Sequence, residues 1–358
     1  EYRRQRQMCI RDRIYSTHIN DHILTFGDTA NLRAAIREMD LSGRFEAIAV
    51  AVSSSTAIIG FDVESFCEEE QDKVKARLIP IAFSALGTDY TVGLTRAMEL
   101  FFKTYVEACL QKPRSYNILG CCADEYLIEN DIKEIQRTLS EMFDYHCRMS
   151  YPLNTSLREI RFAAEAEFNI VLRQEALPAA IWMKERFNIP YVFSDCYGIQ
   201  EMKKLLKEVS EVIRVSPRCA QLDSVNALSA HDKEKHVLIL GNQNSANGLL
   251  RCLTEELEMH NVYAMAFSTT THNKSIQPYK EEILEKQMRD TGPDILIGNS
   301  ILFDFPGHAP SIDIPLLKPV GIAMKTPRPH YPLRGISGYN QLTLMLEGKG
   351  KGNVLFGE

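Results

Sequence analysis

Short apolar runs alternate with amphipathic stretches along most of the chain, a pattern typical of βαβ units built on parallel sheets. The apolar runs have the length and composition of buried strands. They lie at 45–52, 78–83, 116–121, 168–172, 190–193, 237–241, 262–267, 294–298 and 319–323. The pattern therefore predicts an α/β protein with several Rossmann-like parallel-sheet units.

In the stretches between these runs, apolar residues recur at the spacing of a helix. In the helix predicted for residues 130–143, one face holds Ile132, Ile135, Leu139, Met142 and Phe143. This spacing is that of one side of a helix, and Asn130 or Asp131 is placed to cap its start. Similar patterns predict helices at 176–187 and 200–213, and the charged residues 68–78 predict another.

Two polar segments divide the pattern into blocks. Residues 112–115 (KPRS) precede one predicted strand, and the polar residues 214–235 precede another. Cutting there gives three α/β units, at 14–112, 113–225 and 226–358, in line with roughly 150 residues per domain.

The first residues do not fit the pattern. EYRRQRQMCIRDR is basic and has no hydrophobic period, so we interpret residues 1–13 as a non-native segment translated from sequencing-adapter sequence. A genuine basic tail is the alternative. On the first interpretation the gene continues upstream, the chain is a fragment, and its first unit, 14–112, is incomplete.

Composition narrows the class of protein. Apolar residues make up 45% and charged residues 25% of the chain, with a net charge of −6 and a pI of about 5.9, which argues against nonspecific nucleic-acid binding. No apolar run approaches the roughly 18 residues of a membrane span, and no secretory signal is visible. The nine cysteines are irregularly spaced, without a CxxC pair. We therefore expect a cytoplasmic protein without a disulfide framework, a nucleic-acid partner or a membrane association.

Candidate binding residues follow several predicted strands, where α/β proteins hold their ligands. The turn 53–56 (SSST) follows the first strand. Cys121 and Cys122 end another, and they are either metal or cluster ligands or two small buried residues. The loop 241–248 (GNQNSANG) either presents backbone amides to a phosphate or is a plain turn. Because no GxxxxGK[ST] motif occurs, ATP hydrolysis through a P-loop is not expected.

Four histidines are weaker candidates. His18 and His22 have the i, i+4 spacing of a two-histidine metal site, but no third ligand is near in sequence, which favours ordinary polar contacts. His308 and His330 lie in Pro- and Gly-rich loops after late strands, where a binding role and a plain loop role are both open.

Segments spread over most of 14–358 resemble the nitrogenase component 1-type oxidoreductases. That family includes the nitrogenase molybdenum–iron protein subunits, their cofactor-assembly homologues and the subunits of light-independent protochlorophyllide reductase. The similar segments are YSTHINDHILTFGDTANLRAAI, AVAVSSSTAIIGFDV, YNILG, AEFNIVL, ERFNIPYVFSDCYGIQEMKKLL, GPDILIGNS and PLRGISGYNQL, in the family's order. The resemblance implies Rossmann-like units around a central cleft.

The resemblance also implies that the turn after the first strand has lost a ligand. Cluster-bearing members place an iron–sulfur cysteine there, and the matching residue is Ser54, whose hydroxyl is a hard ligand poorly suited to iron–sulfur chemistry. The acidic residue that follows in the family is replaced here by Ala57. The first of the family's two paired aspartates is replaced by Phe61, whereas the second is retained as Asp62. The cofactor stays unknown, and the option left open is an iron–sulfur cluster shared with a partner subunit.

The positions that match the molybdenum-cofactor ligands differ as well. The nitrogenase cysteine falls near Arg173 or Gln174 and the nitrogenase histidine near Lys325, so nitrogen fixation is not expected. Arg173 and Lys325 either bind an anionic ligand, such as a carboxylate-bearing tetrapyrrole or a phosphate, or form surface ion pairs. The candidate cofactor-binding residues are Ser54, Cys121, Arg173, Lys325 and His330, with Cys122 and Cys196 as further cysteines to test.

The leading interpretation is a subunit of a nitrogenase-like reductase complex, with an oxidoreductase role. The resemblance implies two partners: a second component 1-type subunit, homologous or identical, and a separate ATP-dependent iron–sulfur reductase that supplies electrons. The alternatives are a non-catalytic cofactor-assembly scaffold and an anion- or tetrapyrrole-binding protein of the same fold.

Overall fold

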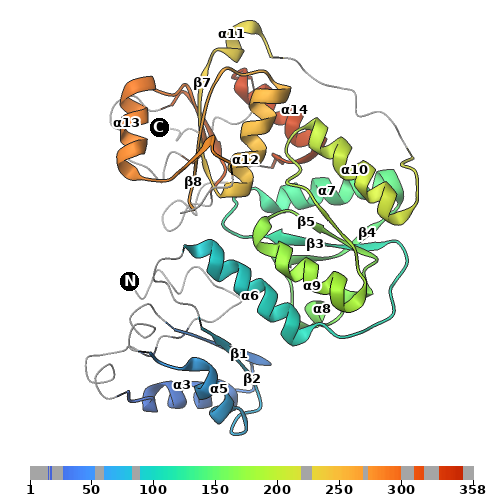
Figure 1. Ribbon diagram of the computed structural model, residues 1–358, viewed down its shortest axis with the longest axis vertical. Helices are drawn as coiled ribbons and strands as arrows, with labels where there is room; N and C mark the ends of the chain where they lie inside the picture. The colour runs from blue at the N-terminus through green and yellow to red at the C-terminus, as the bar shows by residue number, and fades with distance from the viewer. Residues whose placement is uncertain are drawn as a thin grey trace. The chain divides into compact units, whose positions relative to one another are not determined.

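The computed structural model describes residues 15, 17, 27–52, 60–82, 89–218, 228–268, 273–299, 310–317 and 330–349. The chain divides into two compact units, Glu1–Asp89 and Tyr90–Glu358. Both are α/β, and the strands of every described sheet pair in parallel (Figure 1). The predicted fold class is therefore confirmed, whereas the predicted boundaries near 112 and 225 stay a prediction.

The first unit holds a two-stranded sheet with two helices. Its elements are α3 (Ala30–Leu41), β1 (Ala47–Ala51), α5 (Val63–Gln71) and β2 (Arg77–Ile81). Ile36 of α3 and Phe66 of α5 are buried together with Ile48 and Leu78 of the strands. This apolar layer stabilises the unit, because two strands alone are marginal in water.

Asp62, the aspartate that the sequence retains, caps α5. Its Oδ1 accepts a hydrogen bond from the Ser65 backbone N–H at 3.0 Å, its Oδ2 accepts one from the Ser65 hydroxyl at 2.7 Å, and these bonds lower the pKa of the carboxyl. We expect Asp62→Ala to lower the urea midpoint of the first unit, since the cap is lost. Asp62→Asn keeps the acceptor and should retain most of that midpoint. Equal losses in the two variants would show that the side-chain cap does not stabilise α5.

The second unit begins with α6 (Tyr90–Tyr105), followed by a four-stranded sheet of order β4-β3-β5-β6. The strands are β3 (Ser115–Cys121), β4 (His146–Pro152), β5 (Phe168–Val171) and β6 (Tyr191–Phe193). The helices are α7 (Ile128–Phe143), α8 (Leu157–Arg161), α9 (Leu177–Phe187) and α10 (Ile199–Ile213). Figure 1 shows α7 and α10 on one side of this sheet and α9 on the other. Because both faces are covered, β3 and β5 are buried along their whole length.

A five-stranded sheet of order β11-β10-β7-β8-β9 follows. Its strands are β7 (His236–Gly241), β8 (Asn261–Ala266), β9 (Ile276–Pro278), β10 (Ile295–Gly298) and β11 (Ile312–Pro315). The helices are α11 (Ala230–Lys233), α12 (Gln243–Arg251), α13 (Glu281–Thr291) and α14 (Gly335–Leu346). One face packs on α12 and α14, and the other packs on α13. Asn242, after β7, donates to Glu125, after β3, at 2.8 Å, so the carboxyl ends of the two sheets meet.

The predicted strands are confirmed to within a few residues wherever the structure describes them, and the run 319–323 lies outside the described residues. The sequence did not predict β4, β9 or β11. In the edge strand β4, HCRMSYP, the half-buried polar residues Arg148 and Ser150 alternate with the buried Met149 and Tyr151, so the strand has no continuous apolar run. β9 and β11 are only 3 and 4 residues long.

The helix predictions are correct in place and partly wrong at the ends. All five side chains of the predicted face of α7 are buried. The cap predicted for this helix, Asn130 or Asp131, is wrong, because the helix begins after Leu127 and Asp131 is buried in its first turn. The bounds 68–78 are also wrong, since α5 has already ended at Gln71. Among the described residues, no helix is both long and apolar enough to cross a membrane.

Candidate functional site

Charged side chains gather at the carboxyl ends of the strands in the second unit. Asp124 and Glu125 follow β3, Arg173 follows β5 and Asp195 follows β6. Such strand ends are where α/β proteins hold ligands. Glu125, Arg173 and Asp195 are nevertheless buried, with exposed fractions of 3%, 0% and 4%. Their charges must therefore be compensated inside the protein.

Arg173, a predicted anion-binding residue, already has carboxylate partners. Its Nη1 donates to the two oxygens of Asp124 at 2.8 and 2.9 Å, and its Nε and Nη2 donate to Glu175 at 3.3 and 3.1 Å. Burial opposes the charge, but the acidic neighbours outweigh it and raise the pKa of the guanidinium. The alternative of a surface ion pair is wrong, because the side chain of Arg173 is fully buried. Anion binding stays a prediction, and the anion would have to compete with these carboxylates.

Arg334, the residue before α14, is the second cationic centre. Its Nη1 donates to Glu125 at 2.5 Å and to Asp131 at 2.9 Å, and its Nε donates to the Asp195 carbonyl oxygen at 2.9 Å. The guanidinium carbon lies 4.6 Å from the centre of the Tyr197 ring, a cation–π contact. Arg334 thus ties the strand ends of the four-stranded sheet to the helix that packs under the five-stranded one.

Glu125 is shared by both arginines and by the five-stranded sheet. Its Oε1 accepts hydrogen bonds from Asn242 Nδ2 at 2.8 Å and Ser245 Oγ at 3.3 Å, and lies 3.6 Å from Arg173 Nη1. Burial opposes ionisation, but Arg334 and Arg173 outweigh it and lower the pKa of Glu125. Glu125 is therefore the ionised centre of a network that joins the carboxyl ends of the two sheets.

Backbone geometry holds the two arginines in place. Asp131 Oδ1 accepts the backbone N–H groups of Leu333 and Arg334 at 2.7 and 3.0 Å. Gly120 has φ +89°, and a Cβ there would lie 3.0 Å from the backbone nitrogen of Arg173. A glycine at this position therefore allows the β3 and β5 ends to approach closely.

A cavity of about 250 Å³ lies beside this network, at the ends of β5, β6 and β7. It is lined by Gln174, Phe193, Asp195, Gln243, Asn244, Asn247 and Asn273. Asn244 accepts the Gln174 backbone N–H at 3.0 Å and donates to Glu175 at 2.9 Å, which connects the cavity wall to the network. Arg251 donates to both oxygens of Asp195, at 2.8 and 3.1 Å. The wall is therefore mostly carboxamide, and the one charged side chain among the described lining residues is paired.

The predicted cysteine ligands are buried thiols. Cys121, Cys122 and Cys196 have exposed fractions of 0%, 4% and 0%, and burial raises the pKa of each thiol, that of Cys196 to about 12. In the part of the chain that the structure describes, no three His, Cys, Asp or Glu side chains are grouped to hold a metal ion. Because these cysteines belong to no such group, the described residues hold no ready-made cluster site, and the burial of the thiols fits the interpretation as small buried residues. Cofactor binding by Cys121 stays a prediction that would require its site to open.

Several predicted residues cannot be placed or lie away from this network. Outside the described residues are Ser54, Ala57, His18, His22, His308 and Lys325. His330 is exposed, four residues before Arg334. The ring of Phe61 packs on Phe66 in the first unit, with centres 5.6 Å apart. The loop 241–248 forms the end of β7 and the start of α12, where Asn242 Oδ1 caps the helix, and phosphate binding there stays a prediction.

Arg334, Glu125 and Asp195 were not predicted from the sequence as site residues. Arg334 lies within PLRGISGYNQL and Asp195 within the segment around YVFSDCYG, both of which carried only the family resemblance. Glu125 follows the cysteine pair by three residues. The sequence does show an acidic residue or an arginine directly after a buried strand or before a late helix. Such a residue can be predicted to lie at a strand end, but its ion-pair partner cannot be predicted.

Three comparisons bear on the kind of protein. The sequence profile of the family described as Nitrogenase component 1 type Oxidoreductase matches residues 2–340. The chain is 24% identical over 200 residues to the nitrogenase iron-molybdenum cofactor biosynthesis protein NifE of Nostoc sp.. The aligned region covers 55% of this chain and 41% of that protein. It is 18% identical over 324 residues to a subunit of the light-independent protochlorophyllide reductase of Porphyra purpurea, which covers 82% of this chain and 62% of that protein. Each match spans less than two thirds of the relative's length.

A solved structure has the same fold. The chain superposes on a chain of "Nitrogenase Cp1 at pH 6.5" with a TM-score of 0.68 and 13% sequence identity, covering 93% of this chain and 81% of that one. At this identity the likeness shows the fold alone.

Proposed function

Because the chain belongs to the nitrogenase component 1 type oxidoreductases, we propose that it is a subunit of a nitrogenase-like reductase complex. The complex receives electrons from an ATP-dependent iron–sulfur reductase and contains a second component 1-type subunit, homologous or identical. The sequence holds no P-loop, so ATP hydrolysis enters through the separate reductase. Nitrogen is not the proposed substrate, and the proposed location is the cytoplasm.

The cavity at the ends of β5, β6 and β7 carries this proposal. The family resemblance aligns the nitrogenase cofactor cysteine near Arg173 or Gln174, and Gln174 lines the cavity. A ligand there meets carboxamides, which both donate and accept hydrogen bonds, and the apolar side chain of Phe193. This lining suits a polar organic substrate better than a soft metal cluster. The name of the Porphyra purpurea relative likewise indicates a reductase with an organic substrate.

The cysteines of this chain bear on which subunit of the complex supplies the iron–sulfur ligands. In the part of the chain that the structure describes, no three His, Cys, Asp or Glu side chains are grouped to hold a metal ion, so Cys121, Cys122 and Cys196 do not form a ready-made cluster site. We therefore assign the cluster ligands of the complex to the partner subunit rather than to these residues. The role proposed for this chain is to shape the substrate cavity.

Association with the reductase tests the proposal. The chain, co-expressed with its partner subunit, is immobilised and exposed to the iron–sulfur reductase encoded in the source genome. We expect binding at least about tenfold tighter with a nonhydrolysable ATP analogue than with ADP. Gln174→Ala should leave this association unchanged, since the residue lines the cavity. The absence of association under every nucleotide condition would contradict the proposal.

A further inference from the structure

The lining of the cavity at the ends of β5, β6 and β7 restricts the size of its ligand. The described lining residues enclose about 250 Å³, whereas pockets for drug-sized ligands usually measure roughly 300–1,000 Å³. The space is therefore suited to a ligand of one or two rings and is too small to enclose a whole tetrapyrrole.

The same lining restricts the charge of the ligand. No Lys, Arg or His is among the described lining residues, and Asp195 is the one acid. Asp195 Oδ1 accepts from Arg251 Nη2 at 2.8 Å and from the Tyr197 backbone N–H at 3.1 Å, and its Oδ2 accepts from Arg251 Nη1 at 3.1 Å. The cavity therefore offers an anion no cation and offers a cation no unpaired carboxylate. Because a charged group that leaves water needs a partner, this lining favours an uncharged ligand.

Asn244 brings unused hydrogen-bonding capacity to the cavity wall. Its side chain is buried, with an exposed fraction of 7%. Its Oδ1 accepts from the Gln174 backbone N–H at 3.0 Å, and its Nδ2 donates to Glu175 at 2.9 Å. A carboxamide has two N–H groups and two lone pairs on its oxygen. Beyond its bonds to described residues, Asn244 therefore keeps one donor and one acceptor, and the bonds that it makes hold it in place.

Asn247 adds donors on the same face of α12. It follows Asn244 by three residues, a spacing that places the two Cβ atoms roughly 5–6 Å apart on a helix. Asn247 Oδ1 accepts from Asn273 Nδ2 at 2.8 Å, and Asn273 Oδ1 accepts from the Ser275 backbone N–H at 2.9 Å. The N–H groups of the Asn247 side chain bond to no described residue. This face of α12 therefore offers donors and an acceptor side by side, the complement of an amide.

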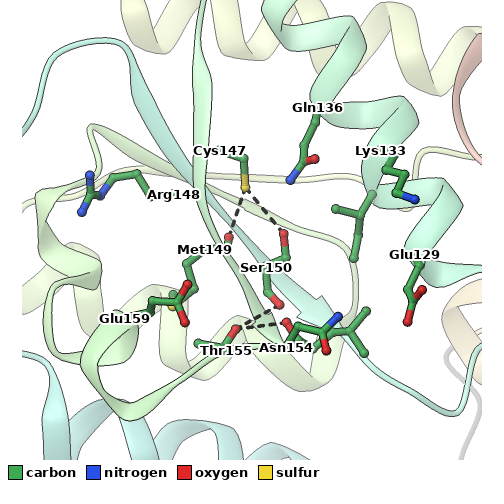
Figure 2. A pocket seen from close by; sticks show the side chains of 12 residues that line it. Glu129, Lys133, Gln136, Cys147, Arg148, Met149, Ser150, Asn154, Thr155 and Glu159 are labelled. Carbon is green, nitrogen blue, oxygen red and sulfur yellow. Dashed lines mark hydrogen bonds between the residues drawn. The ribbon is translucent and has the colours of Figure 1, made fainter.

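Another cavity of similar size has a different lining. It measures about 280 Å³ and lies along the edge strand β4. Figure 2 shows Glu129 and Lys133 of α7 on one side of it, and Arg148 of β4 and Glu159 of α8 on the other. Each side thus carries both an acidic and a basic side chain. Because the two cavities differ in this way, they should select different ligands.

We propose that the cavity at the ends of β5, β6 and β7 selects a small planar ligand with an uncharged amide, as a carboxamide on a ring or as a lactam. The ligand carbonyl oxygen accepts from Asn247, and the ligand N–H donates to Asn244. The ring packs on Phe193, the apolar residue among the described lining residues, which is half-buried at the end of β6. This inference rests on the proposed function, because it names the substrate class of the same cavity.

Three probes of nearly equal size test the selection by calorimetry on the whole chain. Benzamide carries an uncharged amide, benzoate carries a carboxylate in its place, and acetophenone keeps the carbonyl group but has no N–H. We expect benzamide to bind about tenfold more tightly than either of the others. The proposal would be overturned if benzoate or acetophenone bound as tightly as benzamide, or if benzamide showed no saturable binding up to about 10 mM.

Asn247→Asp assigns the benzamide site to this wall. The new carboxylate still accepts from Asn273, but it has no N–H for the ligand carbonyl. We expect the affinity for benzamide to fall about tenfold, with far-UV circular dichroism showing that the variant is folded. Asn188→Asp is the matched control, because Asn188 is exposed at the end of α9 and does not line the cavity. It should leave the affinity unchanged. An unchanged affinity in folded Asn247→Asp would overturn the assignment.

The calorimetry separates this inference from the proposed function, because it needs no reductase. A preference for benzamide without association with the reductase would contradict the proposed function and leave the ligand class in place. Association with the reductase without a preference for benzamide would overturn the ligand class and leave the proposed function in place.

Discussion

Arg334→Ala is expected to lower the free energy of unfolding of the second unit by about 3–5 kcal/mol, the cost of breaking a buried ion pair. The substitution leaves Glu125 and Asp131 buried without their shared cation, at 2.5 and 2.9 Å in the native protein. It also removes the cation–π contact with Tyr197. Urea unfolding at pH 7, followed by far-UV circular dichroism, measures the loss. Arg289→Ala is the matched control, because Arg289 is exposed and pairs only loosely with Glu285 at 3.7 Å, and it should change stability by less than about 0.5 kcal/mol.

The loss in Arg334→Ala should depend on pH. In the native protein the pKa of Glu125 is lowered, so its ionisation stabilises the fold above its unfolded pKa of about 4.3, and that stability is lost as the pH falls through the folded value. Without Arg334, burial dominates and ionised Glu125 destabilises the fold instead. The difference between the variant and the native protein should therefore shrink as the pH is lowered from 7 toward 4. A loss that is constant with pH would show that packing, not charge, holds Arg334.

Arg173→Met is expected to cost about 3 kcal/mol, toward the lower end of the range for breaking a buried pair. Glu175 is 5% exposed and loses its cation, whereas the side chain of Asp124 is 40% exposed and can recover water. Adding Glu175→Gln to Arg173→Met should restore part of the stability, because it removes the buried carboxylate charge that has lost its cation. Glu175 also accepts from Asn244, so amide hydrogen exchange in residues 243–247 should rise in the single variant.

The same variant decides between internal pairing and anion binding at Arg173. If the carboxylates satisfy the guanidinium, inorganic phosphate should raise the Tm of the native protein and of Arg173→Met by the same small amount. A phosphate-dependent stabilisation present in the native protein and absent in the variant would contradict internal pairing. It would support the prediction that Arg173 binds an anionic ligand.

Burial explains which elements could be predicted from the sequence. β3, β5 and β7 are covered on both faces, so their residues form largely apolar runs that are easy to recognise. The buried asparagines that interrupt β3 and β5, Asn117 and Asn169, hydrogen-bond to each other at 2.9 Å. The edge strand β4 lacks such a run. The apolar face of α7 follows the helical period, but its start does not, because Asp131 binds a residue 203 positions away rather than capping the helix.

The candidate site was predictable only in its location. The strand ends were expected to hold ligands, and Arg173 does lie at one of them. Its partner Asp124 is 49 positions away, and the partner of Arg334, Glu125, is 209 positions away. No local spacing relates such residues, so the sequence could not show that the arginine charges are compensated inside the protein.

A double-mutant cycle on Glu125 and Arg334 tests most directly the claim that an ionised Glu125 joins the ends of the two sheets. Urea unfolding at pH 7 would compare the native protein, Glu125→Gln, Arg334→Met and the double variant. We expect a coupling energy of about 2 kcal/mol or more, with the double variant more stable than the sum of the two losses predicts. Losses that add to within about 0.5 kcal/mol would show that the two residues act independently and would contradict the claim.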